Sequence, residues 1–195
     1  MVSVDLNCDM GEGMENDAAL MPYISSANIA CGYHAGDTDT IRRTLSLCQR
    51  YTLSVGVHPS FNDRVNFGRI EMQLTDNALY DLVTDQLQLF ALIAKEEGVP
   101  IHHVKPHGAL YNMAAKNRQM AAVIANAVFS FDKQLILYGL AGSCLIEEGR
   151  RAGLATAAEA FADRTYQPDG FLTPRSMPNA LHSNKEVVVK KTSSR

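Results

Sequence analysis

The sequence predicts an α/β protein built on a parallel sheet with crossover helices. Short apolar runs alternate along the chain with longer stretches of helical spacing, which is the pattern of repeated strand–helix units. Apolar residues make up 46% and charged residues 20%, proportions of a globular domain rather than of a disordered chain or a fibre. The length of 195 residues suits one domain, and no repeat or linker divides it.

The first half of the chain is expected to hold three strands, one helix and a long polar loop. The helix is indicated by Ile41, Leu45 and Cys48, which recur at the spacing of one helix face. The third strand is closed by His58 and Pro59, and a loop rich in Gly, Pro, Asn and Asp follows. In chain order these are strands 2–6 and 28–30, helix 38–51, strand 53–57 and loop 60–74.

The second half continues the alternation. A long helix is expected to begin after Thr75, an N-cap residue with Asp76 in the first turn. It ends before Gly98, which occupies the place of a C-terminal cap, and Pro100 prevents continuation. Beyond it we expect strand 101–105, helix 114–129, strand 134–138, helix 143–152 and strand 154–158.

Charge and cysteine usage exclude several classes of protein. Eighteen basic and 21 acidic residues give a net charge of −3, which offers no electrostatic reason to expect nucleic acid or an anionic membrane as partner. No apolar run is long enough to span a membrane, and the start lacks the basic and apolar regions of a secretory signal. We therefore expect a cytoplasmic protein. Its four cysteines form no CxxC pair and are expected to be free thiols.

Polar residues with chemical potential follow five of the predicted strands, in segments 5–12, 31–37, 58–64, 105–112 and 159–164. Because the carboxyl ends of parallel strands meet at one edge of the sheet, we expect these segments to share one cleft. Asp, Glu and His there suit a divalent metal or acid–base catalysis, whereas Lys105, Arg64 and Arg164 suit a carboxylate or a phosphate. The alternative is structural: Asp9 and Glu12 could simply cap a helix.

The histidines divide into two groups. His58 and His107 come directly after strands, and we expect both to be functional. His102 and His103 lie within one strand and must face opposite sides, so one of them has no chemical role; the sequence leaves open which one points inward. The motifs GxxxxGK[ST], HExxH and GxSxG are absent, which gives no support to a P-loop, a zinc protease of that type or a serine hydrolase.

Several long motifs resemble the LamB/YcsF family. They are DLNCDMGE (5–12), NIACGYHAGD (28–37), GVHPSFNDR (56–64), NFGR (66–69), VKPHGALYN (104–112), AEAFADRTY (158–166) and LTPRS (172–176). They occur in family order and cover the chain to about Ser176. The resemblance implies a TIM-like (β/α) barrel related to the glycoside hydrolase and polysaccharide deacetylase barrels.

The resemblance also implies an activity. Family members are the A component of bacterial 5-oxoprolinase, which uses ATP to open the lactam of 5-oxo-L-proline and give L-glutamate, together with subunits B and C. ATP is therefore an expected cofactor, and the acidic residues and histidines add a divalent metal as a second expectation. The missing P-loop fits a chain that works with partners.

Carried over motif by motif, the resemblance places a set of site residues. The chemistry of lactam opening then suggests roles within this set: Lys105 and Arg64 would contact the substrate anion, and His58 or His107 would act as the base. Asp9 and Glu12 would orient the site or bind a metal. The expected catalytic residues are His58, His107, Asp9 and Asp63, and the expected substrate contacts are Lys105, Arg64, Glu12, His34, Glu159, Asp163 and Arg164, with Asp37 beside them.

We expect residues 1–182 to form a single barrel domain and residues 183–195 to form a polar tail that is truncated or aberrant. Such barrels typically take about 250 residues, so the barrel is expected to be incomplete at its C-terminal end. Two alternatives stay open beside lactam opening. One is a metal-dependent deacetylase-like hydrolase of carbohydrate metabolism, and the other is a non-catalytic barrel that acts as a scaffold.

Overall fold

The computed structural model of the protein describes residues 4–182, 184, 186, 188 and 189. The rest of the predicted tail 183–195, and residues 2 and 3 of the first predicted strand, lie outside the described residues. The described strands form one parallel sheet in the order β1-β2-β3-β4-β5-β6, which confirms the predicted α/β class. Their bounds are Asn7–Met10 (β1), Ser26–Ala30 (β2), Ser54–His58 (β3), Ile101–Val104 (β4), Ile136–Leu140 (β5) and Ala155–Glu159 (β6).

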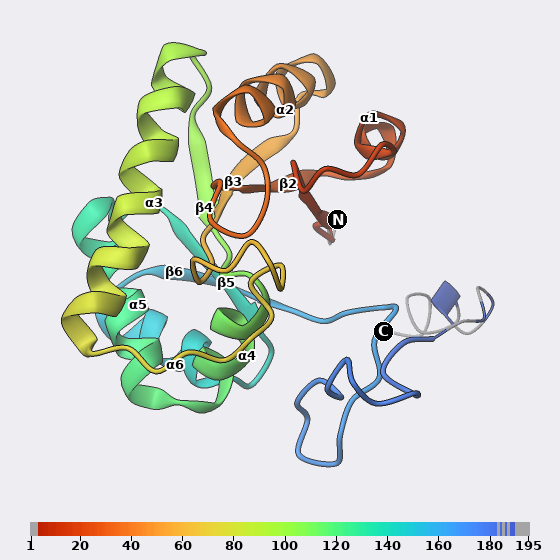
Figure 1. Ribbon diagram of the computed structural model, residues 1–195, viewed down its shortest axis with the longest axis vertical. Helices are drawn as coiled ribbons and strands as arrows, with labels where there is room; N and C mark the ends of the chain where they lie inside the picture. The colour runs from red at the N-terminus through yellow and green to blue at the C-terminus, as the bar shows by residue number, and fades with distance from the viewer. Residues whose placement is uncertain (1–3, 183, 185, 187, 190–195) are drawn as a thin grey trace.

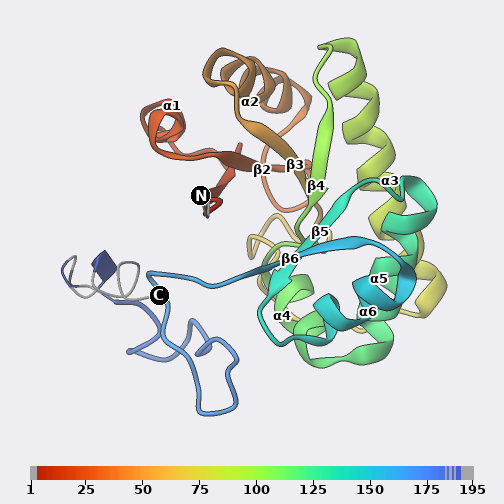
Figure 2. The same ribbon diagram turned by 180° about the vertical axis from the view of Figure 1, so that it is seen from behind.

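The strands curve into half of a barrel, with the longer helices on its outer side (Figures 1 and 2). The edge strands β1 and β6 do not pair with each other in the described part of the chain. A side-chain bond links them instead, because Asn7 Nδ2 donates to Glu159 Oε2 at 3.1 Å. The helices are α1 (Asp17–Leu20), a 3₁₀ turn (Met21–Tyr23), α2 (Thr38–Tyr51), α3 (Asp76–Glu96), α4 (Gly108–Lys116), α5 (Arg118–Phe131) and α6 (Cys144–Ala152).

The hydrophobic core fills the space between the outer face of the sheet and the helices. Ile29, Val57 and Val104 from the strands are fully buried there, together with Leu45 of α2 and Phe90 of α3. Burying a side chain of this size stabilises the fold by about 1.5–3 kcal/mol. The four cysteines are free, as predicted. None of the helices that the structure describes is long and apolar enough to cross a membrane.

The inner face of the sheet is polar. Strand register places Asp9, Asn28, Gly56 and His103 side by side on four neighbouring strands. Asn28 donates to Asp9 Oδ1 at 2.8 Å and accepts from His103 Nε2 at 2.7 Å. The His103 ring covers Gly56, where a Cβ atom would lie only 2.1 Å from Nε2. His103 is therefore the inward histidine of the pair, and His102 is exposed.

Two predicted elements are wrong in position. The first strand is Asn7–Met10, later than the predicted 2–6, and Val4 and Leu6 are exposed. In β1 the polar side chains of Asn7 and Asp9 face the inner side, while Met10 packs into the core. The predicted helix 114–129 is two helices, because Asn117 has an extended backbone and its side chain caps α5 by accepting from Met120 N at 3.1 Å.

Burial of His103 makes the fold sensitive to acid. Desolvation, and then the charge of His102, lower the pKa of His103 from 6.5 to about 3. In the unfolded chain His103 is protonated as the pH falls through about 6.5, whereas in the folded chain it stays neutral. The free energy of unfolding therefore falls as the pH drops below about 6.5. At pH 5 this one group costs about 2 kcal/mol.

We expect His103→Gln, whose amide can still donate to Asn28, to lose less stability than the wild type between pH 7 and pH 5. The difference in that loss should be about 2 kcal/mol. Urea unfolding at both pH values measures it. Parallel losses in the two proteins would contradict a neutral, buried His103.

Candidate functional site: a carboxylate and three histidines at the strand ends

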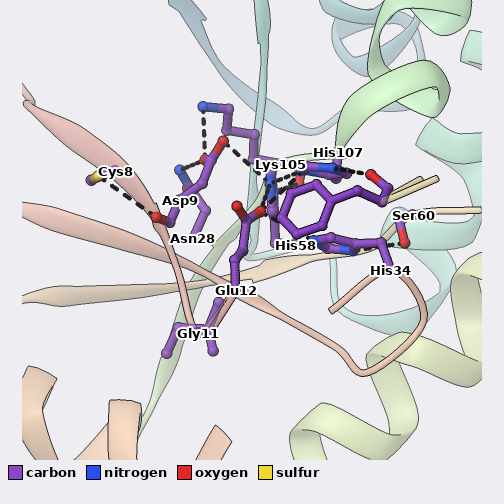
Figure 3. A network of polar contacts seen from close by, with 12 residues as sticks. Cys8, Asp9, Gly11, Glu12, Asn28, His34, His58, Ser60, Lys105 and His107 are labelled. Atoms are coloured by element: carbon purple, nitrogen blue, oxygen red, sulfur yellow. Dashed lines mark hydrogen bonds and ion pairs between the residues drawn. The ribbon is translucent and has the colours of Figure 1, made fainter. Parts of the chain in front are cut away.

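The carboxyl ends of the first four strands bring one carboxylate and three histidines together (Figure 3). Glu12 follows β1, His34 follows β2, His58 is the last residue of β3 and His107 lies just before α4. From Glu12 Oε1 the distances are 3.1 Å to His34 Nε2, 3.7 Å to His58 Nε2 and 3.3 Å to His107 Nδ1. One ligand atom from each of the four residues lies within 4.8 Å of the others. We call these four residues the Glu–His cluster.

The outer nitrogen of each ring is held by a hydrogen bond. His58 Nδ1 donates to the Lys105 carbonyl oxygen at 2.6 Å, and His107 Nε2 donates to the Phe67 carbonyl oxygen at 3.0 Å. His34 Nδ1 lies 2.8 Å from Ser60 Oγ, whose own hydrogen is donated to the Phe61 carbonyl oxygen. Ser60 therefore accepts from His34. These bonds fix the tautomer of all three neutral rings.

The inner nitrogens consequently point lone pairs, not hydrogens, at the Glu12 carboxylate. His107 Nδ1 and His58 Nε2 are only 2.9 Å apart. Each neutral ring carries its hydrogen on the other nitrogen, so neither ring can donate a hydrogen bond to the other. Converging lone pairs repel unless a cation or a proton lies among them. Three imidazole nitrogens and one carboxylate oxygen form a donor set suited to Zn²⁺ or another first-row divalent metal. The Glu–His cluster thus fits a divalent metal.

Electrostatics agree with this arrangement. Burial, and then the charge of His58, lower the pKa of His34 and of His107 to about 3, so both rings stay neutral. Burial acts to lower the pKa of His58 as well, but the carboxylates of Asp9 and Glu12 outweigh it and raise that pKa. His58 is therefore the ring that takes up a proton most easily when no metal is bound.

A buried lysine forms the second half of the site. Lys105 Nζ lies 3.2 Å from Asp9 Oδ1 and 3.1 Å from Glu159 Oε2, and it donates to Asn7 Oδ1 at 3.0 Å. Burial disfavours the ammonium, but these two carboxylates more than compensate and raise the pKa of Lys105. Burial likewise opposes the Asp9 anion, yet His58 and Lys105 hold the pKa of Asp9 well below its usual range. Asp9 Oδ2 lies 3.4 Å from His58 Nε2 and links the two halves.

Both halves open into one pocket of about 670 Å³. Its wall runs from the Glu–His cluster, past α4, to the loop after β6. The residues predicted from sequence that line it are Asp9, Glu12, His58, Lys105, His107 and Arg164, while His34 and Glu159 reach it through their bonds to Glu12 and Lys105.

Four predicted site residues lie outside the described wall of the pocket. Asp63 accepts from the backbone and side chain of Asn66 and so shapes the loop after β3. Arg64 donates to the carbonyl oxygens of Gly32 and Gly36 at 2.6 and 2.8 Å. Asp37 caps α2, and Asp163 is exposed. Asp63, Arg64 and Asp37 therefore make contacts that shape a loop or cap a helix. None of the four residues lies in the pocket wall.

The wall also contains three residues for which no role was predicted from the sequence. Two of them, Arg69 and Arg175, belong to the NFGR and LTPRS motifs, and this membership was the feature of the sequence that could have identified them as site residues. Tyr111 lies in VKPHGALYN and lines the same pocket. Ser60 orients His34, but apart from its place after Pro59 in the HPS sequence nothing in the sequence indicated this contact.

Comparison with known proteins identifies relatives along nearly the whole chain. A protein of Tolumonas auensis, named as the A component of 5-oxoprolinase, is 54% identical over 194 residues, which cover 97% of this chain and 77% of that protein. A protein of the same name from Brevibacillus brevis is 50% identical over 191 residues, covering 95% of this chain and 75% of the relative.

Solved structures agree with the sequence relatives. The lactam utilization protein of Thermus thermophilus superposes with a TM-score of 0.91 at 42% identity, over 97% of this chain and 78% of that protein. A putative cellobiose-phosphate cleavage protein of Enterococcus faecalis has a TM-score of 0.58 at 13% identity, over 96% of this chain and 73% of that one, and shares the fold alone.

The family model extends the resemblance beyond the motifs. The motifs stop at about Ser176, whereas the model for the LamB/YcsF family matches residues 4–194, so the match includes residues 183–194 of the predicted tail. The coverage, the identities and the structural match agree, and the chain belongs to the LamB/YcsF family.

Proposed function

We propose that this chain is the A component of a 5-oxoprolinase and that its pocket opens the lactam of 5-oxo-L-proline to L-glutamate. The observation that carries the proposal is the Glu–His cluster, which lies at the strand ends beside the buried Lys105. The names of relatives at 50–54% identity support the choice of substrate. Subunits B and C would be the partners, and ATP would be consumed by the assembled complex.

Opening the lactam adds one water across a stabilised amide. The water oxygen bonds to the carbonyl carbon, the carbon–nitrogen bond breaks, and the ring nitrogen takes a proton to become the amine of glutamate. Transfer of a phosphoryl group from ATP to the carbonyl oxygen, with release of ADP, would activate the carbonyl carbon for the attack of water. Breaking the carbon–nitrogen bond would then leave an acyl phosphate, and a second water would release phosphate from it. The chain must then hold the substrate, position a base and stabilise the developing negative charge.

The described residues can fill these roles. Glu12, His34, His58 and His107 would hold a divalent metal, which, when bound, supplies Lewis-acid polarisation of a carbonyl or phosphoryl oxygen. Asp9 is kept ionised, and its Oδ2 lies 3.4 Å from His58 Nε2, so it can accept a hydrogen bond from a water in the pocket and orient that water. Lys105 is kept charged and can stabilise an oxyanion.

The decisive experiment mixes this chain with B and C subunits, ATP and 5-oxoproline and measures glutamate. We expect glutamate only when the chain and both partners are present, because the chain has no P-loop of its own. A longer family member tested in the same mixture is the positive control. Activity of that control, with none from this chain, would contradict the proposal and favour the scaffold alternative.

The same cluster also suits a metal-dependent amidase that acts on an acetylated carbohydrate. The same donor set would serve it, and only the substrate differs. Acetate release from an N-acetylated sugar by the chain alone, without ATP, would favour this second function. Glutamate release that depends on ATP and the partners would exclude it as the principal activity.

A further inference from the structure

Three arginines gather in the pocket wall beyond the Glu–His cluster. Arg69, Arg164 and Arg175 all line the pocket. Arg164 is buried and anchored, because Nη2 donates to the Thr173 carbonyl oxygen at 2.7 Å and Nε donates to the Ala180 carbonyl oxygen at 3.3 Å. These bonds tie the guanidinium to the loop that carries Arg175.

Arg69 is connected to the Glu–His cluster through an aromatic ring. Its guanidinium carbon lies 4.8 Å from the centroid of the Phe67 ring. That ring packs edge-on against His34 and His107, with 5.4 Å between centroids in each case. Cation–π contact and packing therefore hold Arg69 next to the cluster.

The positive charges of Arg69 and Arg175 are not balanced by a close carboxylate. Within the described residues, neither side chain has a carboxylate oxygen within 4.0 Å. Burial, and then the charge of Arg175, lower the pKa of both Arg69 and Arg164. Like-charged guanidinium groups in one pocket wall repel one another, and an anion that binds between them relieves this repulsion.

Tyr111 lines the same pocket, but its buried hydroxyl is not free for a ligand. It faces the Glu159 carboxylate, whose negative charge, after burial, raises the pKa of Tyr111. The binding of an anion in this pocket is therefore argued from the arginines alone.

The two cations expected to contact the substrate anion have other partners, and the role proposed for Lys105 is to stabilise the charge that develops during the reaction. Lys105 lies between Asp9 and Glu159, and Arg64 is bound to two backbone carbonyl oxygens. We propose that Arg69 and Arg175 form an oxyanion-binding subsite of this pocket, and that Arg164 holds the loop that carries Arg175. The identity of the substrate rests on the proposed function. The oxyanion would be either the carboxylate of 5-oxoproline or a phosphoryl group transferred from ATP to the lactam oxygen.

The test uses the full chain with Arg69 and Arg175 both changed to Gln. These two side chains are exposed, so the double variant should fold, and Arg164 is left in place because its bonds support the loop. The exposed Arg50→Gln on α2, remote from the pocket wall, is the matched control. Isothermal titration calorimetry measures binding of inorganic phosphate, 5-oxoproline and 2-pyrrolidinone, a lactam that lacks the carboxylate.

We expect the double variant to bind at least one anionic probe roughly ten-fold more weakly or worse, the factor for losing a charge-assisted hydrogen bond. Weakened 5-oxoproline alone assigns the subsite to the carboxylate, weakened phosphate alone assigns it to a phosphoryl group, and weakening of both supports a shared oxyanion site. Unchanged affinity for both anions, no anion binding by the wild type, or equal weakening of 2-pyrrolidinone would overturn the proposal. Anion binding without glutamate release would instead contradict the proposed function alone.

Discussion

Glu12→Gln should abolish both metal retention and lactam opening while leaving the fold intact. The Glu12 carboxylate lies 3.1–3.7 Å from one nitrogen of each of three histidines, and it is the negatively charged member of the Glu–His cluster. An amide of the same shape removes that charge and offers a neutral oxygen in its place. Loss of even an outer-shell partner costs metal affinity about 10–100-fold, so loss of this carboxylate should cost at least as much.

Metal content after dialysis and glutamate release by the reconstituted complex are the two measurements. Glu15→Gln, an exposed change three residues along the chain, is the matched control and should retain both properties. A Glu12→Gln protein that keeps one metal per chain and normal glutamate release would show that the cluster is structural. Metal content is read independently of activity, so an inactive complex leaves this part of the test informative.

The position of the site could be predicted from the sequence because parallel strands share an edge. Glu12, His34, His58 and His107 each follow, or end, a different strand among the first four, and their motifs are far apart in the chain. Strand alternation alone was enough to place them at one rim. The family resemblance then supplied an expected substrate, which the residues alone could not provide.

The contacts that orient the cluster could not be predicted in the same way. The carbonyl oxygens of Lys105 and Phe67 accept from His58 and His107, and every residue has a carbonyl oxygen, so residue type carries no signal. The roles predicted for Asp63 and Arg64 stay predictions. The contacts that the structure gives these side chains are with their own loop and with nearby carbonyl oxygens, which residue type does not reveal.

The misplaced first strand has a related cause. Predicted strands are recognised by apolar residues, but the inner face of this half-barrel carries the site, so its strands bear Asn and Asp where a core would bear Val or Ile. Asn7 and Asp9 therefore looked like a loop. Their alternation with Cys8 and Met10, which pack toward the core, was the period-two pattern that identifies β1.

Gly108→Ala should destabilise the fold strongly. Gly108 has φ +55°, and a Cβ atom there would lie 2.4 Å from the Gly68 carbonyl oxygen. That oxygen accepts from Ala109 N at 2.9 Å, so it cannot move away without losing a bond. Left-handed strain of about 1–2 kcal/mol and overpacking of about 1–3 kcal/mol together predict a loss of roughly 2–5 kcal/mol.

The damage should reach the Glu–His cluster, because Gly68 lies against His34 and His107 from the other side. A Cβ atom built on Gly68 would be 3.0 Å from His34 Cβ and 3.1 Å from His107 Cδ2, so the Gly68 backbone has little room to retreat. Gly98→Ala is the matched control, since Gly98 has φ +66° with open space around its Cβ position and should lose only the strain of about 1–2 kcal/mol. Urea unfolding midpoints compare the two variants. Equal losses of stability in the two variants would mean that the loop carrying Gly68 moves away from α4 at little cost. The close approach of this loop to α4 would then not hold His107 in place.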